Sequence, residues 1–129
     1  MNELKIELRP ARTNFAPGEE LAGMASWILD QTPRAMELRL FWFTKGAGNE
    51  DVGVVETVRF DHPAAQESRP FRLRLPESPY SFSGKLITLA WALELVAEPS
   101  QTVARAHIVV APNGREVQLQ AASETPTPE

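Results

Sequence analysis

The 129-residue sequence contains no cysteine. This absence excludes disulfide bonds, thiolate metal sites and cysteine nucleophiles together. The sequence also has no excess of positive charge, because it contains 13 lysines and arginines and 17 acidic residues, which gives a net charge of −4. A protein that binds nucleic acid needs excess positive charge to neutralise phosphates, so nucleic-acid binding is disfavoured.

The sequence has no long apolar run either. A membrane-spanning helix needs about 20 apolar residues, and the most apolar stretch is interrupted by Lys85, Glu94 and Glu98. The first ten residues, MNELKIELRP, lack the basic region followed by an apolar region that a secretory signal peptide requires. We therefore expect a cytoplasmic protein without an integral membrane segment.

Proline and glycine, in contrast, are frequent: eleven prolines and seven glycines divide the chain into short segments. Within these segments apolar and polar residues alternate, as in Leu4, Ile6 and Leu8, which is typical of strands buried on one face. Strands are predicted at about residues 3–9, 20–30, 35–44, 52–60, 69–75, 85–97, 102–111 and 115–120. A short helical turn could lie between the fourth and fifth of these.

Seven or eight strands with regular turn signals predict an all-β fold, an antiparallel β-sandwich. Asn113-Gly114 lies between the last two strands and predicts that they form a hairpin. Residues 1–120 would form one domain, and residues 121–129, which offer no apolar anchor, would be a disordered tail. Trp27, Trp42 and Trp91 all fall on inward faces, so we expect them to form a core cluster rather than a binding platform.

Two stretches resemble the arrestin-like superfamily. Residues 15–23, FAPGEELAG, are similar to the entry to its second strand, and residues 75–96, LPESPYSFSGKLITLAWALELV, are similar to its later signature of a Pro/Ser-rich loop and a long strand. The resemblance covers residues 3–111 and implies an immunoglobulin-like sandwich of the arrestin N-domain type. It also implies an adaptor or scaffold that binds other proteins and is not an enzyme.

The sequence departs from that superfamily in two respects. It spans one sandwich, whereas arrestins have two. The first strand of receptor-binding arrestins carries paired lysines that engage phosphates, but here only Lys5 lies on that strand, between Glu3 and Glu7. The resemblance therefore does not extend to the sensing of phosphorylated receptors.

Catalytic and metal-binding patterns are weak. A hydrolase needs a nucleophile, a base and an orienting acid in contact. The sequence offers these residue types, but without a recognised spacing, at Asp61, His62, Ser81, Ser83 and His107. The serines of SFSG are not in a nucleophile elbow, and adjacent Asp61 and His62 would point to opposite sides of a strand. We predict no catalytic residue, no cofactor and no metal site.

The segment LFWF, residues 40–43, is apolar on both faces of its predicted strand. If Leu40 and Trp42 point inward, Phe41 and Phe43 point outward. Either long side chains such as Arg39 cover them, or they form an exposed patch for a partner or for self-association. Arg72 and Arg74 alternate on another strand and could attract acidic partners, or they form an ordinary solvated face.

These observations lead to a non-enzymatic interaction module that binds protein partners and could form a homo-oligomer. The alternative is a sandwich that holds a small apolar ligand between its sheets, or a transport accessory of that kind. A cavity of this sort is hard to reconcile with three large indole side chains in the core. A hydrolase is the third hypothesis.

Overall fold

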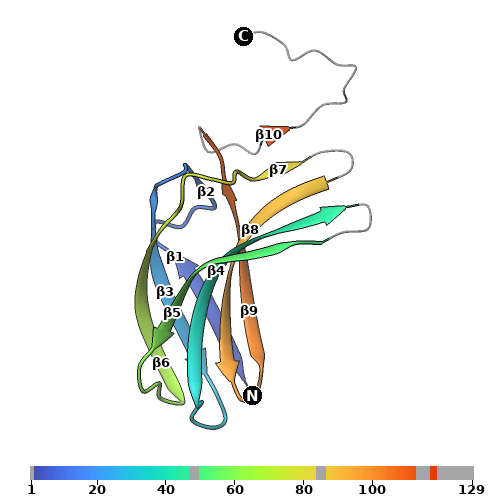
Figure 1. Cartoon of the computed structure of the whole chain (residues 1–129). Helices are drawn as coiled ribbons and strands as arrows, with labels where there is room; N and C mark the ends of the chain where they lie inside the picture. The colour runs from blue at the N-terminus through green and yellow to red at the C-terminus, as the bar shows by residue number, and fades with distance from the viewer. Residues whose placement is uncertain (1, 47–49, 84–86, 113–116, 119–129) are drawn as a thin grey trace, which may run out of the picture.

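The computed structural model describes residues 2–46, 50–83, 87–112 and 117–118 (Figure 1). Seven strands in these ranges are six to twelve residues long: β1 (Glu3–Leu8), β3 (Glu20–Ile28), β4 (Ala35–Gly46), β5 (Val52–Phe60), β6 (Gln66–Arg74), β8 (Ile87–Glu98) and β9 (Thr102–Val110). Three more are two residues long: β2 (Asn14–Phe15), β7 (Phe82–Ser83) and β10 (Val117–Gln118). The predicted all-β fold is confirmed, and no helix among the described residues is long enough to cross a membrane.

The strands form two sheets. The smaller sheet has the antiparallel order β1-β3-β6, and the larger sheet has the order β10-β7-β8-β4-β5. The edge of β8 that does not face β4 is shared, because β7 pairs with its beginning and β9 with the rest. Figure 1 shows β3 and β6 of the smaller sheet on the left and β8 and β9 of the larger sheet on the right.

The core lies between the sheets, where alternate residues of successive strands meet. Trp27 on β3 and Trp91 on β8 are 1% and 0% exposed, and the half-buried Trp42 packs against the same cluster. Each buried indole N–H donates a hydrogen bond to a backbone carbonyl: Trp27 to Ala64 at 2.8 Å and Trp91 to Pro79 at 3.0 Å. The prediction that the three tryptophans belong to one core is confirmed.

The turn between β5 and β6, residues 61–65, is held by Glu67. One carboxylate oxygen of Glu67 accepts a 2.8 Å hydrogen bond from the backbone N–H of Ala64, and the other accepts a hydrogen bond from the guanidinium of Arg69. The hydrogen bond from Arg69, followed by that from Ala64, lowers the pKa of Glu67 below its usual value. The same turn places the Ala64 carbonyl where it accepts the hydrogen bond from the Trp27 indole. The carboxylate of Glu67 therefore helps to position the side chain of Trp27 in the core.

The segment before residue 69 differs from the prediction. Strand β6 begins at Gln66, so no helical turn forms among residues 66–70. Pro70 lies within this strand, opposite Met24 of β3. Proline is tolerated there because β6 is an edge strand, and one of its two sides needs no ladder hydrogen bonds.

The predicted hairpin between residues 102–111 and 115–120 is wrong in its pairing, although residues 113–116 lie outside the described part of the chain. Strand β10 pairs in parallel with β7, not with β9. The end of β9 already has other partners: β2 runs parallel to it at Val109 and Val110, and Ser81 bonds to both the N–H and the C=O of Val110. The predicted tail, residues 121–129, also lies outside the described residues.

Candidate interaction surface on the larger sheet

Strand β4 crosses the middle of the larger sheet and presents different side chains on its two faces. Leu40 is fully buried in the core between the sheets. Phe41 and Phe43 lie on the opposite, outer face, with their ring centroids 5.8 Å apart. We call Phe41 and Phe43 the aromatic pair. The alternation predicted for LFWF is therefore observed, with two rings outside the core.

The two rings are covered to different degrees. Phe41 is only 7% exposed and Phe43 is half-buried. The Arg105 guanidinium of β9 lies 5.2 Å from the centroid of Phe41 and 6.0 Å from that of Phe43. Phe43 also has Lys45 5.5 Å away and the His107 ring at 6.1 Å. A cation above an aromatic face is attracted by the ring quadrupole, so these contacts order Phe43 without burying it.

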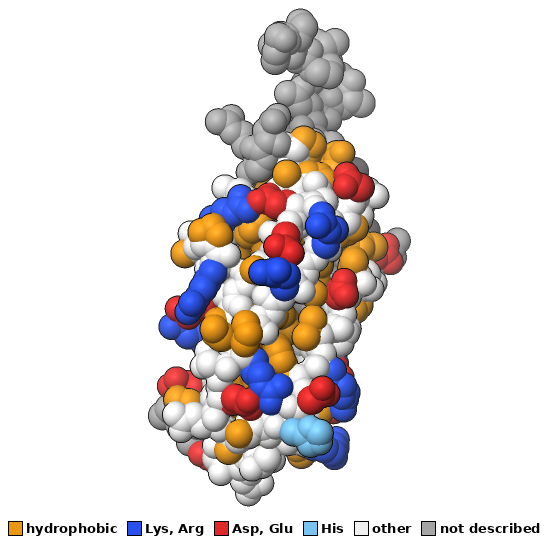
Figure 2. All heavy atoms as spheres, turned by 90° about the vertical axis from the view of Figure 1, so that its left-hand side faces the viewer, with side chains coloured by type: hydrophobic (Ala, Val, Ile, Leu, Met, Phe, Trp, Pro, Cys, Tyr) orange, Lys and Arg blue, Asp and Glu red, His pale blue; other side chains and the backbone are white. Residues whose placement is uncertain are grey.

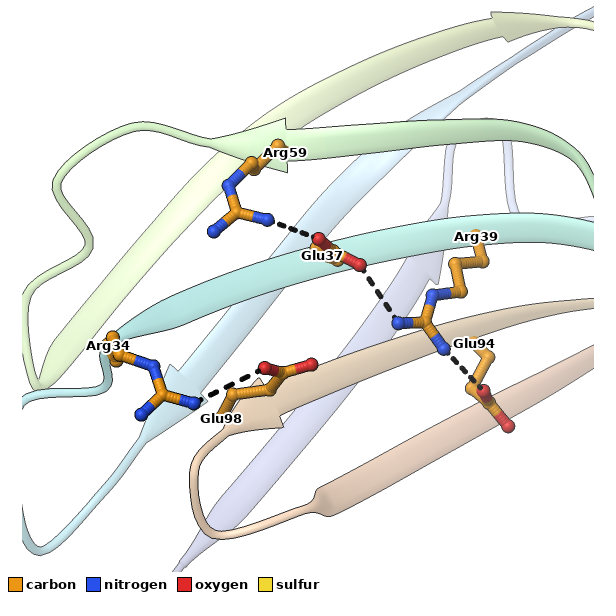
Figure 3. A network of polar contacts seen from close by, with 6 residues as sticks. All are labelled: Arg34, Glu37, Arg39, Arg59, Glu94 and Glu98. Atoms are coloured by element: carbon orange, nitrogen blue, oxygen red, sulfur yellow. Dashed lines mark hydrogen bonds and ion pairs between the residues drawn. The ribbon is translucent and has the colours of Figure 1, made fainter.

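A chain of ion pairs crosses four strands of this face. Figure 3 shows the part of it that joins β5, β4 and β8. Glu37 of β4 contacts Arg59 of β5 and, at 2.9 Å, Arg39 of its own strand. Arg39 also lies 4.0 Å from Glu94 of β8, and Glu94 accepts a 2.7 Å hydrogen bond from Arg105 of β9. The carboxylate-bearing side chains are only 16% and 17% exposed, so screening by water is reduced for them. The chain of ion pairs fixes Arg105 where it covers the aromatic pair.

Next to the aromatic pair, strand β5 exposes apolar side chains. Val52 lies opposite Phe43 and Val54 opposite Phe41 in the strand register. Val52, Val54 and Val55 are 64%, 57% and 40% exposed, and we call them the valine edge. They make up half of the six large hydrophobic side chains that are exposed in the described part of the chain. The apolar surface therefore runs from the half-buried Phe43 to the rim of the sheet.

Arg72 and Arg74 lie on a different surface, the outer face of β6 in the smaller sheet. Arg72 is 3.6 Å from Glu20 of β3, and Arg74 donates a 2.9 Å hydrogen bond to the carbonyl of Gly18. Figure 2 shows on this side of the molecule positive and negative side chains intermixed with separate hydrophobic patches. The four residues predicted as a partner surface thus form two surfaces on two sheets.

The residues considered for catalysis are not brought together into one site. Ser81 is 1% exposed, and its hydroxyl oxygen accepts the backbone N–H of Val110 at 3.0 Å. Asp61 and His62 belong to the β5–β6 turn, which lies at the end of the sandwich opposite β7 (Figure 1). His107 lies beside Phe43, and the side chain of Ser83 is outside the described part. Among the described residues, no group of three His, Cys, Asp or Glu side chains could hold a metal ion.

The structural role of Ser81 can be tested by Ser81→Ala. This change leaves the buried N–H of Val110 without its acceptor, so we expect the free energy of unfolding to fall by about 1–2 kcal/mol. Urea denaturation followed by circular dichroism measures the effect. The control is Ser68→Ala, which removes an exposed hydroxyl and should cost less than about 0.5 kcal/mol. Equal losses for the two variants would contradict the role given to Ser81.

The open side of the sandwich contains a groove of about 660 Å³ between β1 and β9. It is lined by apolar residues of β1 and by Arg9, Arg12 and His107. The groove opens to solvent and does not lie between the buried indoles, where the alternative hypothesis placed an apolar ligand. The space between the sheets at Trp27 and Trp91 is filled by the core cluster.

Comparisons with known proteins provide a structural likeness. No family model and no curated protein matches the chain. Among solved structures, Spo0M, a sporulation control protein from Bacillus subtilis, superposes with a TM-score of 0.60 at 18% identity, over 86% of this chain and 49% of Spo0M. The chain therefore spans about half the length of Spo0M.

Two other solved structures are more distant. A β-glucosidase from Listeria innocua has a TM-score of 0.48 at 13% identity, over 91% of this chain and 16% of the enzyme. A superoxide reductase from Ignicoccus hospitalis has a TM-score of 0.45 at 15% identity, over 83% of this chain and 78% of the reductase. Likenesses this weak say nothing about activity. What the described strands and the likeness to Spo0M establish is the fold, an arrestin-like β-sandwich.

Proposed function

We propose that this domain is a non-enzymatic interaction module that binds a protein partner through the outer face of its larger sheet. The observation that carries the proposal is the continuous apolar surface formed by Phe43, Val52 and Val54, which lies beside the chain of ion pairs on the same face. Exposed apolar patches with a polar rim are typical of protein-binding sites. Spo0M is described as a control protein, and a regulatory role exerted by binding fits this surface.

The charges around Phe43 indicate what kind of partner fits. Lys45, Arg105 and His107 surround the ring, whereas Glu94 is already bonded to Arg105. The partner would insert an apolar side chain beside Phe43 and place carboxylates near Lys45. Charge complementarity of this kind selects the partner and speeds its association. A cytoplasmic setting for this interaction is part of the proposal, and it is supported by the absence of cysteine from the sequence.

The arginines of β6 are less suitable as the main contact. Arg74 already bonds to Gly18, and Arg72 lies beside Glu20, so a partner would compete with existing contacts. Their side chains are also exposed, and isolated ion pairs at such positions contribute little to affinity. We therefore assign them at most a secondary role in binding.

Phe43→Ser is expected to abolish partner binding while the domain stays folded, because Phe43 is only half-buried and lies outside the core. Affinity capture with the wild-type domain, followed by mass spectrometry, identifies the partner, and isothermal titration with that partner measures the loss. Phe41 is a poor probe, since Phe41→Ser empties a buried site and should cost about 3 kcal/mol or more of stability.

The matched control is Ile28→Ser on β3. Ile28 is 47% exposed and lies on the smaller sheet, so this variant removes a comparable apolar side chain from another face. Capture should be unchanged in this variant. A partner that is retained by Phe43→Ser and lost by Ile28→Ser would place the binding site on the smaller sheet and overturn the proposal.

A further inference from the structure

Strand β5 is the open edge of the larger sheet, since β4 is its only partner among the described strands. The backbone N–H of Thr44 donates to the carbonyl of Asp51 at 2.9 Å. Because hydrogen-bonded positions alternate along an antiparallel pair, Asp51 and Gly53 bond toward β4. The N–H and C=O groups of Val52 and Val54 therefore point away from the sheet and are available for another strand.

A β-bulge changes this alternation in the middle of β5. Glu56 is paired with Leu40 and Val54 with Phe41, which leaves Val55 as the extra residue. Beyond the bulge the backbone groups that point to the open edge are consequently those of Thr57 and Arg59. The side chains of these two residues lie on the outer face, as do those of Val52 and Val54.

The other edge strands carry the features that prevent edge-to-edge pairing. Strand β6 contains Pro70 and arginines, and β1 alternates Glu3, Lys5 and Glu7 along its length. Charged side chains and proline are the usual protection of an open edge. Strand β9, whose second side pairs with β2 only at Val109 and Val110, carries Arg105 and His107. The half of β5 that contains the valine edge has neither charged residues nor proline, so among these strands it is the edge most open to pairing.

We propose that two copies of this chain associate through their β5 edges, antiparallel and about a two-fold axis at Val54, because Val55 and Glu56 together occupy one position of the ladder. This register places Val52 of one copy opposite Thr57 of the second copy. Both residues have open-edge backbone groups and outer-face side chains, as pairing in a continuous sheet requires. The exposed Glu50 then lies opposite the second copy's Arg59, and the symmetry repeats this opposite-charge contact.

Other registers fit less well. If the pairing shifts by one residue, backbone N–H and C=O groups at the open edge of one copy lie opposite groups of the second copy that already bond to its own β4. The same shift places side chains of the outer face of one copy opposite side chains of the inner face of the other. Moving the axis by one residue along the strand in either direction places like charges opposite each other, Asp51 against Glu56 or Glu50 against Asp61. Like charges directly opposite on a sheet are destabilising. Charge and backbone phase therefore select the same register.

Association of this kind would join the two larger sheets and bring the two aromatic pairs onto one continuous outer face. The inference rests on the proposed function, because it identifies a second copy of the chain as one protein that this surface binds. A dimer would also present the Phe43 site twice, and two linked sites raise the avidity for a bivalent partner.

The first test is molar mass by light scattering over a concentration series. The wild-type chain is expected to be dimeric at high concentration, and Val54→Lys should weaken dimerisation by about 100-fold or more, because it places a like charge next to the axis from each copy. The control, Val103→Lys, changes a valine that is 47% exposed on the same outer face but on β9, and should leave the dimer intact.

The second test uses the absence of native cysteine. Val52→Cys and Thr57→Cys are prepared as separate proteins with different tags, mixed, and oxidised mildly. A disulfide needs Cα atoms about 4.4–6.8 Å apart, so the register predicts a cross-link between the two variants and none within either variant alone. This result does not depend on whether Val54→Lys folds.

Two outcomes would overturn the inference: a wild-type chain that is monomeric at every concentration, or Val52→Cys chains that cross-link with each other as readily as with Thr57→Cys chains. If the wild type is monomeric but Phe43→Ser still loses its partner, the inference fails and the proposed function stands. If the dimer forms and Phe43→Ser leaves partner binding unchanged, the proposed binding site at Phe43 fails and the inference of a β5 dimer stands.

Discussion

Trp91→Ala is expected to lower the free energy of unfolding by about 4 kcal/mol, because it removes the largest side chain of β8 from a fully buried site. Trp91 lies opposite Trp42 on β4 and Ile108 on β9, so the cavity would adjoin three strands of the larger sheet. The loss also leaves the Pro79 carbonyl without the indole donor. Urea denaturation followed by far-ultraviolet circular dichroism measures the change.

The control for this prediction is Trp91→Phe, which keeps an aromatic ring in the core and removes the hydrogen bond to Pro79. Its cost should be about 1–2 kcal/mol, mainly for the unpaired carbonyl and a smaller cavity. If Trp91→Ala lost less than about 1 kcal/mol, the indole could not be a buried part of the core.

Gly23→Ala is expected to cost about 3 kcal/mol of stability, because the methyl group would clash with backbone as well as with a side chain. A Cβ atom at Gly23 would lie 2.1 Å from the carbonyl oxygen of Glu7 and 2.9 Å from the ring of Phe71. The substitution therefore has to push β1 away from β3, with which it pairs over its whole length. Thermal unfolding and hydrogen exchange of the β1 amides would both report the separation.

Gly53→Ala provides the comparison. A Cβ atom at Gly53 would lie 2.2 Å from the indole ring of Trp42, which is a half-buried side chain that can rotate away. We expect a smaller loss of stability and unchanged protection of the β1 amides. If Gly53→Ala were as destabilising as Gly23→Ala, the rigid contact between β1 and β3 would not be the cause of the larger effect.

The long strands could be predicted from the sequence because each of them has one buried face. In β3 and β8 every second residue is apolar, and the observed strands begin and end within about three residues of the prediction. The inward position of the tryptophans follows from the same period. The fold class could therefore be predicted from the local alternation of apolar and polar residues, which is visible in a single sequence.

Strands β2 and β7 could not be predicted, since each is two residues long and depends on a distant partner. Strand β10 lies within the predicted strand 115–120, but its partner was predicted wrongly. The bulge in β5 likewise could not be predicted from the alternation of residues, because it is defined by the register of β5 with β4. The hairpin prediction failed for the same reason, because the turn signal at Asn113-Gly114 says nothing about which edge is already occupied.

The candidate surface was predicted in part. The apolar letters of LFWF identified the aromatic pair, but the cation that covers it, Arg105, comes from β9 and could be found only from the sheet order. The valine edge had a signal in the sequence, three valines within residues 52–55, which is apolar on both faces in the same way as LFWF. Arg72 and Arg74 face outward as predicted, yet the topology separates them from the phenylalanines.

The parallel pairing of β2 with β9 has a consequence for how the chain folds. It joins Asn14, near the start, to Val109, near the last described residues, and such distant contacts form late and slow the overall rate. During synthesis on the ribosome, β2 cannot pair with β9 until Val109 and Val110 have emerged. Until then β2 and the end of β9 are unpaired, and unpaired strand edges favour aggregation.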